Sequence, residues 1–244
     1  MKPTIILVHG ATLNGASWAP VRRALEPDFN VLAPDLPGHG ARRHEKFTLQ
    51  GAIDTVTAAA QSVAPAPVIL AGDSLGGYTS QASAGHLPQE QLKGLVVGGS
   101  THEFIGPPAW PYLLKALMFR LIFAVKDERR MVDAKIPGLL AREFGLGPED
   151  VDATMKAGMS LAVFPQAVNA LHNVDLRSRM AAITQPILFV NGDLDKFHVR
   201  GEKHYVAAAQ HGSIHRFAGT DHGVSLRRAG EFAGLIRQFA QRVL

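Results

Sequence analysis

The sequence contains no cysteine among its 244 residues. The chain therefore forms no disulfide, offers no thiolate to a metal ion and has no cysteine nucleophile. A chain without cysteine is compatible with the reducing cytoplasm, and we expect a cytoplasmic location. No uncharged stretch approaches the roughly 20 residues that span a bilayer, so we expect no stable membrane insertion. The apolar run near the N-terminus is short and ends in His9-Gly10, which is typical of a first strand rather than a signal peptide.

The sequence also has no long cluster of charged residues of one sign. Lys and Arg number 25 and Asp and Glu number 21, which gives a formal net charge of +4 at pH 7. The strongest local runs are at 42–44 and 128–130, and neither is interleaved with aromatic residues, so we interpret both as solvated surface. The sequence therefore predicts no nucleic-acid partner.

Short apolar runs alternate with helix-like segments along most of the chain. Continuous apolar runs are typical of strands that are buried on both faces of a parallel sheet. The pattern predicts an α/β fold, with a mostly parallel central sheet flanked by helices on both faces. The expected strands are at 4–10, 30–40, 67–72, 92–100, 186–193 and 213–223, and the expected helices are at 18–27, 49–64, 76–88, 203–210 and 225–244.

The interval 101–182 breaks this alternation. It contains no convincing strand, begins with the proline-rich "GPPAWPY" and continues through the apolar "LLKALMFRLIFAV". We interpret 101–182 as a helical cap inserted into a core domain formed by 1–100 and 183–244. Because ligands bind beyond the carboxyl ends of the strands in open α/β sheets, the cap is expected to cover the binding site.

A serine follows the third expected strand. Residues 72–76 read Gly-Asp-Ser-Leu-Gly and fit the pattern G-x-S-x-G. A strand that turns directly into a helix strains the serine backbone and brings the residues two before and two after it too close for side chains. The pattern predicts that Ser74 is a nucleophile at a helix N-terminus; the alternative is an ordinary glycine-rich turn.

A serine nucleophile needs a base, and the base needs an acid that orients it. His222 lies in a glycine-bounded loop after the last expected strand and is the predicted base. The predicted acid is Asp195 rather than Asp193, because Asp193 follows the Gly192 turn directly and is expected to bond the local backbone. Asp221 is adjacent to the histidine and is expected to stabilise the loop.

Two backbone N–H groups are expected to stabilise an oxyanion at this serine. They belong to Leu75, which follows the serine, and to Ala11, in the loop after the first strand. Thr12 is a second candidate in that loop, and its hydroxyl can line the substrate pocket. We expect His9 to brace the same loop, and Asp73 to act as a hydrogen-bonded brace that points away from the reacting centre.

Five motifs spread over the chain together resemble the α/β-hydrolase superfamily. The resemblance implies a largely parallel sheet with one antiparallel strand near its start, a cap in the 101–182 region, no cofactor, and catalytic roles for Ser74, Asp195 and His222. The longer stretch "HGATLNGASWAPV" resembles the small serine esterase branch that includes plant methyl esterases and hydroxynitrile lyases. Gly10 stands where the lyases carry threonine, which favours an esterase. The motifs are "ILVHGA" (6–11), "APDLPGHG" (33–40), "LAGDSLGG" (70–77), "VNGDLD" (190–195) and "TDHG" (220–223).

The sequence thus predicts a serine hydrolase that cleaves a carboxylic ester of a small, largely hydrophobic molecule through an acyl-serine intermediate. No metal is expected, and the chain is expected to be a monomer or homodimer. Two alternatives stay open: a lactone or carbon–carbon bond hydrolase with the same three residues, and a non-catalytic small-molecule binding protein. The expected pocket residues are Thr12, Trp110, Leu114, Met118 and Phe164.

Overall fold

The computed structural model describes residues 2–244, in which six strands form one sheet with the order β2-β1-β3-β4-β5-β6. The strands are β1 (Thr4–Val8), β2 (Asn30–Leu32), β3 (Val68–Asp73), β4 (Leu92–Gly98), β5 (Ile187–Gly192) and β6 (Gly212–Phe217). The helices are α1 (Ala19–Leu25), α2 (Leu49–Gln61), α3 (Leu75–Ser83), α4 (Trp110–Val125), α5 (Glu128–Phe144), α6 (Pro148–Ala157), α7 (Val163–Leu171), α8 (Leu176–Arg179), α9 (Lys196–Ala208), α10 (Val224–Arg227) and α11 (Ala229–Val243).

The strand pairing confirms the predicted α/β class and corrects one detail of it. Every neighbouring pair of strands in residues 2–244 is parallel. The antiparallel strand that the resemblance implies near the start is therefore not part of the described sheet. The first strand, β1, pairs in parallel with both β2 and β3, so the carboxyl ends of these strands lie at one edge.

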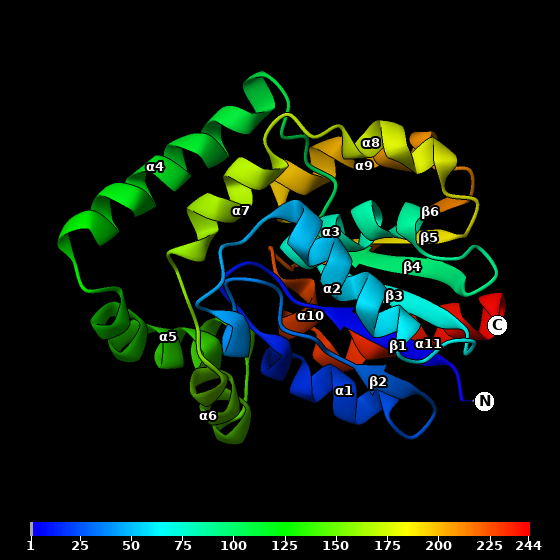
Figure 1. Cartoon of the computed structure of the whole chain (residues 1–244), viewed down its shortest axis with the longest axis horizontal. Coiled ribbons are helices and arrows are strands. Elements are labelled where there is room, and N and C mark those ends of the chain that lie inside the picture. Colours follow the sequence, from blue (N-terminus) through cyan, green and yellow to red (C-terminus); the bar gives the residue numbers. More distant parts are fainter. Residues whose placement is uncertain (1) are drawn as a thin grey trace.

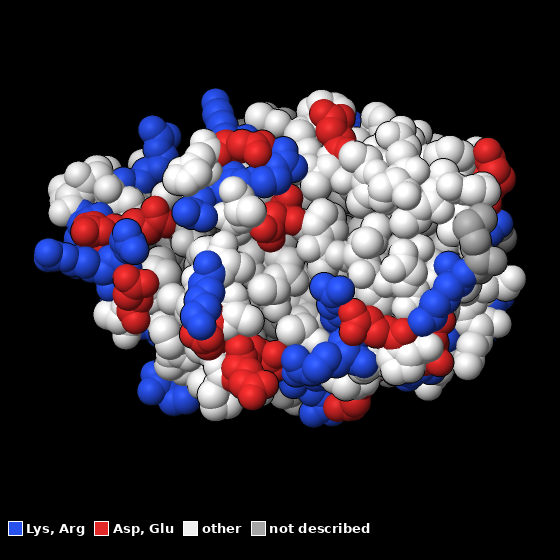
Figure 2. All heavy atoms as spheres, turned by 60° about the horizontal axis from the view of Figure 1, so that its bottom comes forward, with Lys and Arg blue, Asp and Glu red and all other residues white. Residues whose placement is uncertain are grey.

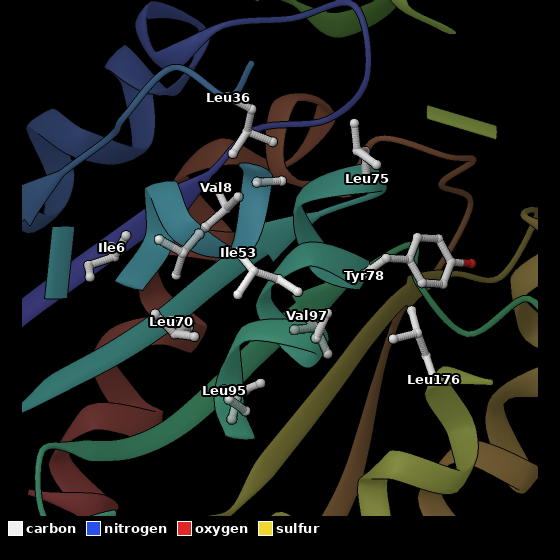
Figure 3. Packing of buried hydrophobic residues seen from close by; sticks show 14 of the residues in the cluster. Ile6, Val8, Leu36, Ile53, Leu70, Leu75, Tyr78, Leu95, Val97 and Leu176 are labelled. Carbon is white, nitrogen blue, oxygen red and sulfur yellow. The ribbon is translucent and has the colours of Figure 1, made fainter. Parts of the chain in front are cut away.

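Strands β1, β3, β4 and β5 are buried on both faces, as their apolar runs predict, whereas the edge strand β6 is largely exposed. Alternate residues of β1 belong to different cores: Ile6 packs with α2, α3 and α9 on one face, and Ile5 packs with α1 and α11 on the other. Figure 3 shows the first of these cores, in which Ile53 of α2 lies among strand residues such as Val8 and Leu70, and Tyr78 of α3 lies beside Leu176 of α8. This period of two explains why the strands read as continuous apolar runs.

Local signals set most element boundaries. The Thr48 side chain accepts a hydrogen bond of 3.0 Å from the Gly51 amide and caps α2, as a threonine before a helix predicts. Helix α9 begins at Lys196, whereas the sequence predicted a start at 203. The first turns were missed because they are polar and show little hydrophobic periodicity. The last predicted helix is divided at Arg228, whose φ of −129° separates α10 from α11.

The region predicted as a cap contains helices and no strand among the described residues. Helices α4, α5, α6 and α7 lie at the end of the molecule opposite to both termini (Figure 1). In α4, Ala116 is the one buried residue. By length and composition alone, the helical segment Pro107–Val125 could also cross a membrane. The division into core and cap remains our proposal.

The charged side chains are mixed in sign on the face shown in Figure 2. Lys and Arg lie among Asp and Glu over much of this face, and an uncharged area extends beside them. The net charge of +4 is therefore not gathered into a basic stripe on this face.

Candidate active site

Ser74 lies between β3 and α3, on a turn that only close backbone contacts allow. Its φ of 55° and ψ of −121° are far from the helical and strand regions, which is a strained conformation for a residue other than glycine. A Cβ at Gly72 would lie 2.3 Å from the Gly76 carbonyl oxygen, and one at Gly76 would lie 1.8 Å from the Val8 carbonyl oxygen. The two glycines of the pattern are thus required by space.

The structure brings Ser74, His222 and Asp195 into one hydrogen-bonded chain. His222 Nε2 lies 2.9 Å from Ser74 Oγ, and His222 Nδ1 lies 2.7 Å from Asp195 Oδ2. Asp195 follows β5, and His222 lies in the loop between β6 and α10, so the parallel sheet places both at the same edge as the serine turn. Asp195 is buried, whereas 40% of the His222 side chain is exposed and can meet a ligand.

The charges around His222 favour its protonated form. Burial by itself lowers the pKa of His222, but the hydrogen bond to Asp195 and the charges of Asp195, Asp73 and Asp221 raise that pKa above its ordinary value of 6.5. Burial alone would raise the pKa of the Asp195 carboxyl, but hydrogen bonds from His198 and His222 outweigh it, and that pKa lies well below its ordinary value. Asp195 is therefore ionised beside a histidine that accepts a proton readily.

Sequence reasoning missed His198, which contacts the same carboxylate. His198 Nδ1 lies 2.7 Å from Asp195 Oδ2, the oxygen that His222 also uses, and the two imidazole rings stack with centroids 4.8 Å apart. His198 is buried in the first turn of α9, three residues after Asp195. The spacing Asp-x-x-His at a helix start was the available signal.

The neighbouring acids and His9 have the structural contacts that the sequence predicts. Asp73 Oδ2 accepts hydrogen bonds from the amide and the hydroxyl of Ser225, at 3.1 and 2.5 Å. Asp193 accepts from the Thr220 amide at 3.3 Å. His9 Nε2 accepts from the Leu36 amide at 3.1 Å, while its Nδ1 lies 2.9 Å from the carbonyl oxygen of Gly10, so it braces the loop.

Ala11 and Leu75 line one small pocket together with Ser74. Leu75 is the first residue of α3, where an amide N–H has no acceptor within the helix. Thr12, the next residue of the loop, has a φ of 69°, which turns the chain sharply beside the serine. The assignment of Ala11 and Leu75 as oxyanion donors stays a prediction, and this geometry supports it.

A cavity of about 500 Å³ lies between the core and the predicted cap. It reaches the hydroxyl-bearing turn at Ser74 and the exposed edge of His222. Lys115 of α4 gives this mostly apolar space a cationic side chain, which lies 5.1 Å from the ring centroid of Phe164. The lining residues are Ala11, Thr12, Ser74, Pro111, Tyr112, Lys115, Phe119, Phe144, Leu161, Phe164, Asp195, Phe197, Asp221 and His222.

A second, much smaller pocket of about 30 Å³ also reaches Ser74. Most of its walls are apolar, and α7 contributes four of its lining residues. Its volume suits a group of one or two carbon atoms. The lining residues are Ala11, Ser74, Leu75, Tyr78, Phe104, Tyr112, Phe164, Ala167, Val168, Leu171 and His198.

The structure corrects part of the predicted substrate pocket. Thr12 and Phe164 line the large cavity, but Trp110, Leu114 and Met118 lie on the outer face of α4, where they are 68, 61 and 53% exposed. None of these three lines either pocket beside Ser74. Their spacing of four residues puts them on one helix face. Because α4 is apolar on both faces, no polar stripe in the sequence marks which face turns outward.

Among the described residues, Asp195, His198 and His222 also form a cluster that could hold a metal ion, since their ligand atoms lie within 4.8 Å of one another. However, both histidine Nδ1 atoms lie at hydrogen-bond distance from one carboxylate oxygen. Two imidazole N–H groups that donate to one carboxylate account for this arrangement. The cluster can therefore hold and transfer a proton at the serine hydroxyl.

Comparison with known proteins agrees with the fold and with the site geometry described above. A family model described as the alpha/beta hydrolase family matches residues 5–235. The chain is 31% identical over 257 residues to a pimeloyl-[acyl-carrier protein] methyl ester esterase of Vibrio atlanticus, covering 98% of this chain and 95% of that protein. It is 26% identical over 249 residues to a protein of the same name from Xanthomonas axonopodis pv. citri, covering 99% of this chain and 96% of that protein.

A solved structure from work on carboxylesterases of Nitrososphaera gargenis superposes on this chain with a TM-score of 0.78. The identity is 18%, and the match covers 99% of this chain and 91% of the other. At this identity the likeness shows the shared fold.

Proposed function

Because this chain belongs to the alpha/beta hydrolase family, we propose that it is a serine hydrolase that cleaves carboxylic esters through an acyl-serine intermediate. The observation that carries the proposal is the hydrogen-bonded chain from Ser74 Oγ through His222 to Asp195. The curated relatives, which are named as esterases, support the same reaction type.

The geometry supports the following sequence of steps. His222 Nε2 takes the proton of Ser74 Oγ while that oxygen attacks the ester carbonyl carbon. The N–H groups of Ala11 and Leu75 stabilise the tetrahedral oxyanion. His222 then gives its proton to the leaving alkoxide oxygen, and a water activated by the same ring hydrolyses the acyl-serine. Asp195 stays ionised and stabilises the imidazolium.

The pH profile of the reaction follows from the state of His222. Only the neutral imidazole accepts the serine proton, so kcat/KM falls as pH falls through the pKa of His222. Because that pKa is raised, we expect the acid limb to have its midpoint above pH 6.5. Asp195 adds no second limb there, because its pKa is lowered. Initial rates on a p-nitrophenyl ester between about pH 5 and pH 9 measure this limb; a midpoint below 6.5 would contradict the assignment.

The two pockets divide the ester into a small and a large part. We propose that the smaller group of the ester enters the pocket of about 30 Å³ and the larger, hydrophobic group enters the cavity of about 500 Å³. The names of the curated relatives support this division, because they specify a methyl ester. Substrates with two bulky groups should fit poorly.

Isomeric esters test this division without changing total hydrophobicity. We expect kcat/KM for methyl octanoate or heptyl acetate to exceed that for butyl pentanoate by about tenfold or more, since one excess methylene in a tight pocket costs about 1–3 kcal/mol. Val168→Ala, which enlarges the small pocket, should raise the rate on butyl pentanoate, and Ala167→Leu should reduce turnover of all three. Equal rates for the three esters with the wild type would refute the division.

A wider substrate panel tests the proposed reaction against the two alternatives. Purified protein is assayed with p-nitrophenyl esters of increasing chain length, with lactones and with β-diketones. Ester hydrolysis that Ser74→Ala abolishes supports the proposal. Preferred turnover of lactones or β-diketones would favour the second reaction type, and ligand binding without any turnover would favour a binding protein.

Location and assembly extend the proposal. The absence of cysteine is compatible with the reducing cytoplasm, and we propose that the protein acts there, on a small-molecule ester and without a nucleic-acid partner. We propose a monomer or a homodimer, which light scattering of the purified protein distinguishes.

A further inference from the structure

A buried histidine outside the predicted set shares the acid that orients the base. His198 is 2% exposed at its side chain, and its Nδ1 lies 2.7 Å from Asp195 Oδ2. His222 Nδ1 lies at the same distance from the same oxygen. One carboxylate oxygen therefore accepts from two imidazole rings.

His198 is neutral, which fixes the position of its proton. Burial lowers the pKa of His198 to about 4, even though the hydrogen bond to Asp195 acts in the opposite direction. A neutral imidazole donates from only one nitrogen, and an ionised carboxylate only accepts. The ring of His198 must therefore carry its proton on Nδ1 and donate it to Asp195.

The surroundings of His198 hold it in this position. Its ring stacks on His222 with an interplanar angle of 22°. The rings of Tyr78 of α3 and His102 of the loop after β4 also lie near it, with centroids 6.4 and 6.0 Å away. The hydroxyl of Thr101 donates to the His198 carbonyl oxygen at 2.7 Å. The stacking, the hydrogen bond to Asp195 and the hydrogen bond from Thr101 together favour this one position of the ring and its backbone.

We propose that His198 is a positioning residue that holds Asp195 Oδ2 in place and tunes His222 as a base. This inference rests on the proposed function. Two donors on one oxygen share its electron density, so each hydrogen bond is weaker than a single one would be. The carboxylate consequently stabilises the protonated form of His222 less than it would without His198.

The direction of the effect follows from this sharing. Removal of the His198 donor leaves His222 as the partner of Asp195 Oδ2 and raises the pKa of His222, because hydrogen bonding to the charged form favours that form. Other charges that face His222 stay in place: Asp73 from the end of β3 and Asp221 from its own loop. The α10 residue Arg227 contacts the His222 carbonyl oxygen, at 2.9 Å.

The test compares two substitutions of His198 by the pH profile of ester hydrolysis. His198→Phe keeps a flat ring for stacking but cannot donate, and His198→Asn places an amide donor near the position of Nδ1. We expect the acid limb of kcat/KM to move upward by about half a unit to one unit in the Phe variant. The rate on the acid limb then falls by about three- to tenfold, and the Asn variant returns the limb toward the wild-type position.

A purely structural role gives a different result. It lowers the rate at all pH values together and leaves the midpoint unchanged, and this result would overturn the proposal. A shifted limb that His198→Asn fails to restore would overturn it as well. His204→Phe is the matched control, because His204 is an exposed residue of the same helix and lies outside the cluster.

Nitrogen chemical shifts of the wild-type histidines give a test that needs neither a folded Phe variant nor turnover. At about pH 7, His198 should be neutral and protonated on Nδ1, and the signal is assigned by its loss in His198→Asn. Protonation on Nε2 would overturn the proposal. If the wild type hydrolyses no ester, the proposed function fails, whereas this spectrum still decides the geometry at His198.

Discussion

Ser74→Ala is expected to lower kcat for ester hydrolysis by about 10⁶-fold, the magnitude typical of removing a serine nucleophile. The physical reason is that no other hydroxyl lies within hydrogen-bond distance of His222 Nε2 among the described contacts. Substrate affinity should stay within a few fold, because the hydroxyl adds little to either pocket. Stopped and steady-state assays with a p-nitrophenyl ester measure both quantities.

The matched control for this variant is Ser83→Ala. Ser83 is a buried serine at the end of α3, the helix that follows Ser74, and its hydroxyl donates to the Thr79 carbonyl oxygen at 2.8 Å, away from the cavity. Its activity should stay close to that of the wild type. Loss of activity in both variants would indicate a folding defect, and retention of activity in Ser74→Ala would contradict the acyl-serine mechanism.

The second large effect that we expect is a loss of stability in Gly76→Ala, at the second glycine of the nucleophile turn. A Cβ at Gly76 would lie 1.8 Å from the Val8 carbonyl oxygen and 2.8 Å from that of His9. Both contacts are with backbone, which cannot rotate aside as a side chain does. Gly76→Ala must therefore push α3 away from β1 and is expected to cost more than about 4 kcal/mol of unfolding free energy.

Thermal unfolding measures this cost. A loss of this size lowers Tm by about 10 °C or more in a chain of this length. Gly85→Ala is the control, because a Cβ at this exposed glycine meets nothing within 4 Å. Its Tm should be unchanged or slightly higher. Equal Tm values for the two variants would show that the turn at Ser74 is looser than the structure describes.

The fold was predictable because most strands have a local sequence pattern that identifies them. Most strands are short apolar runs that end in glycine or a turn, and the burial of β1, β3, β4 and β5 on both faces follows from the parallel sheet. The family match confirms the predicted class, and the relatives bear out ester hydrolysis as the activity class. The resemblance was wrong on the antiparallel strand, whose presence no residue pattern in this chain required.

The proposed triad was predictable because the sheet fixes where its members meet. Ser74, Asp195 and His222 each follow a strand, and parallel strands end at one edge, so distance in sequence does not matter. Asp195 was separable from Asp193 because the latter comes directly after the turn and bonds the backbone of Thr220. The catalytic roles remain our prediction.

The orientation of α4 in the cap and the role of the buried His198 could not be predicted from local sequence patterns. In α4, Leu114 faces solvent and Lys115 faces the cavity, a division that depends on how the helix packs on α7. His198 lies in a polar stretch that resembles an ordinary helix start. The Asp-x-x-His spacing allows its contact with Asp195, but its stacking on His222 depends on the loop that follows β6. Tertiary packing, rather than local pattern, decides both cases.

Intact-mass analysis after treatment with a fluorophosphonate tests the central claim most directly, since such a probe reacts with a serine that a neighbouring base has activated. We predict one adduct per chain, located on the peptide that contains Ser74, and none in Ser74→Ala or His222→Ala. An unmodified wild-type protein, or an adduct at another residue that persists in Ser74→Ala, would contradict the account.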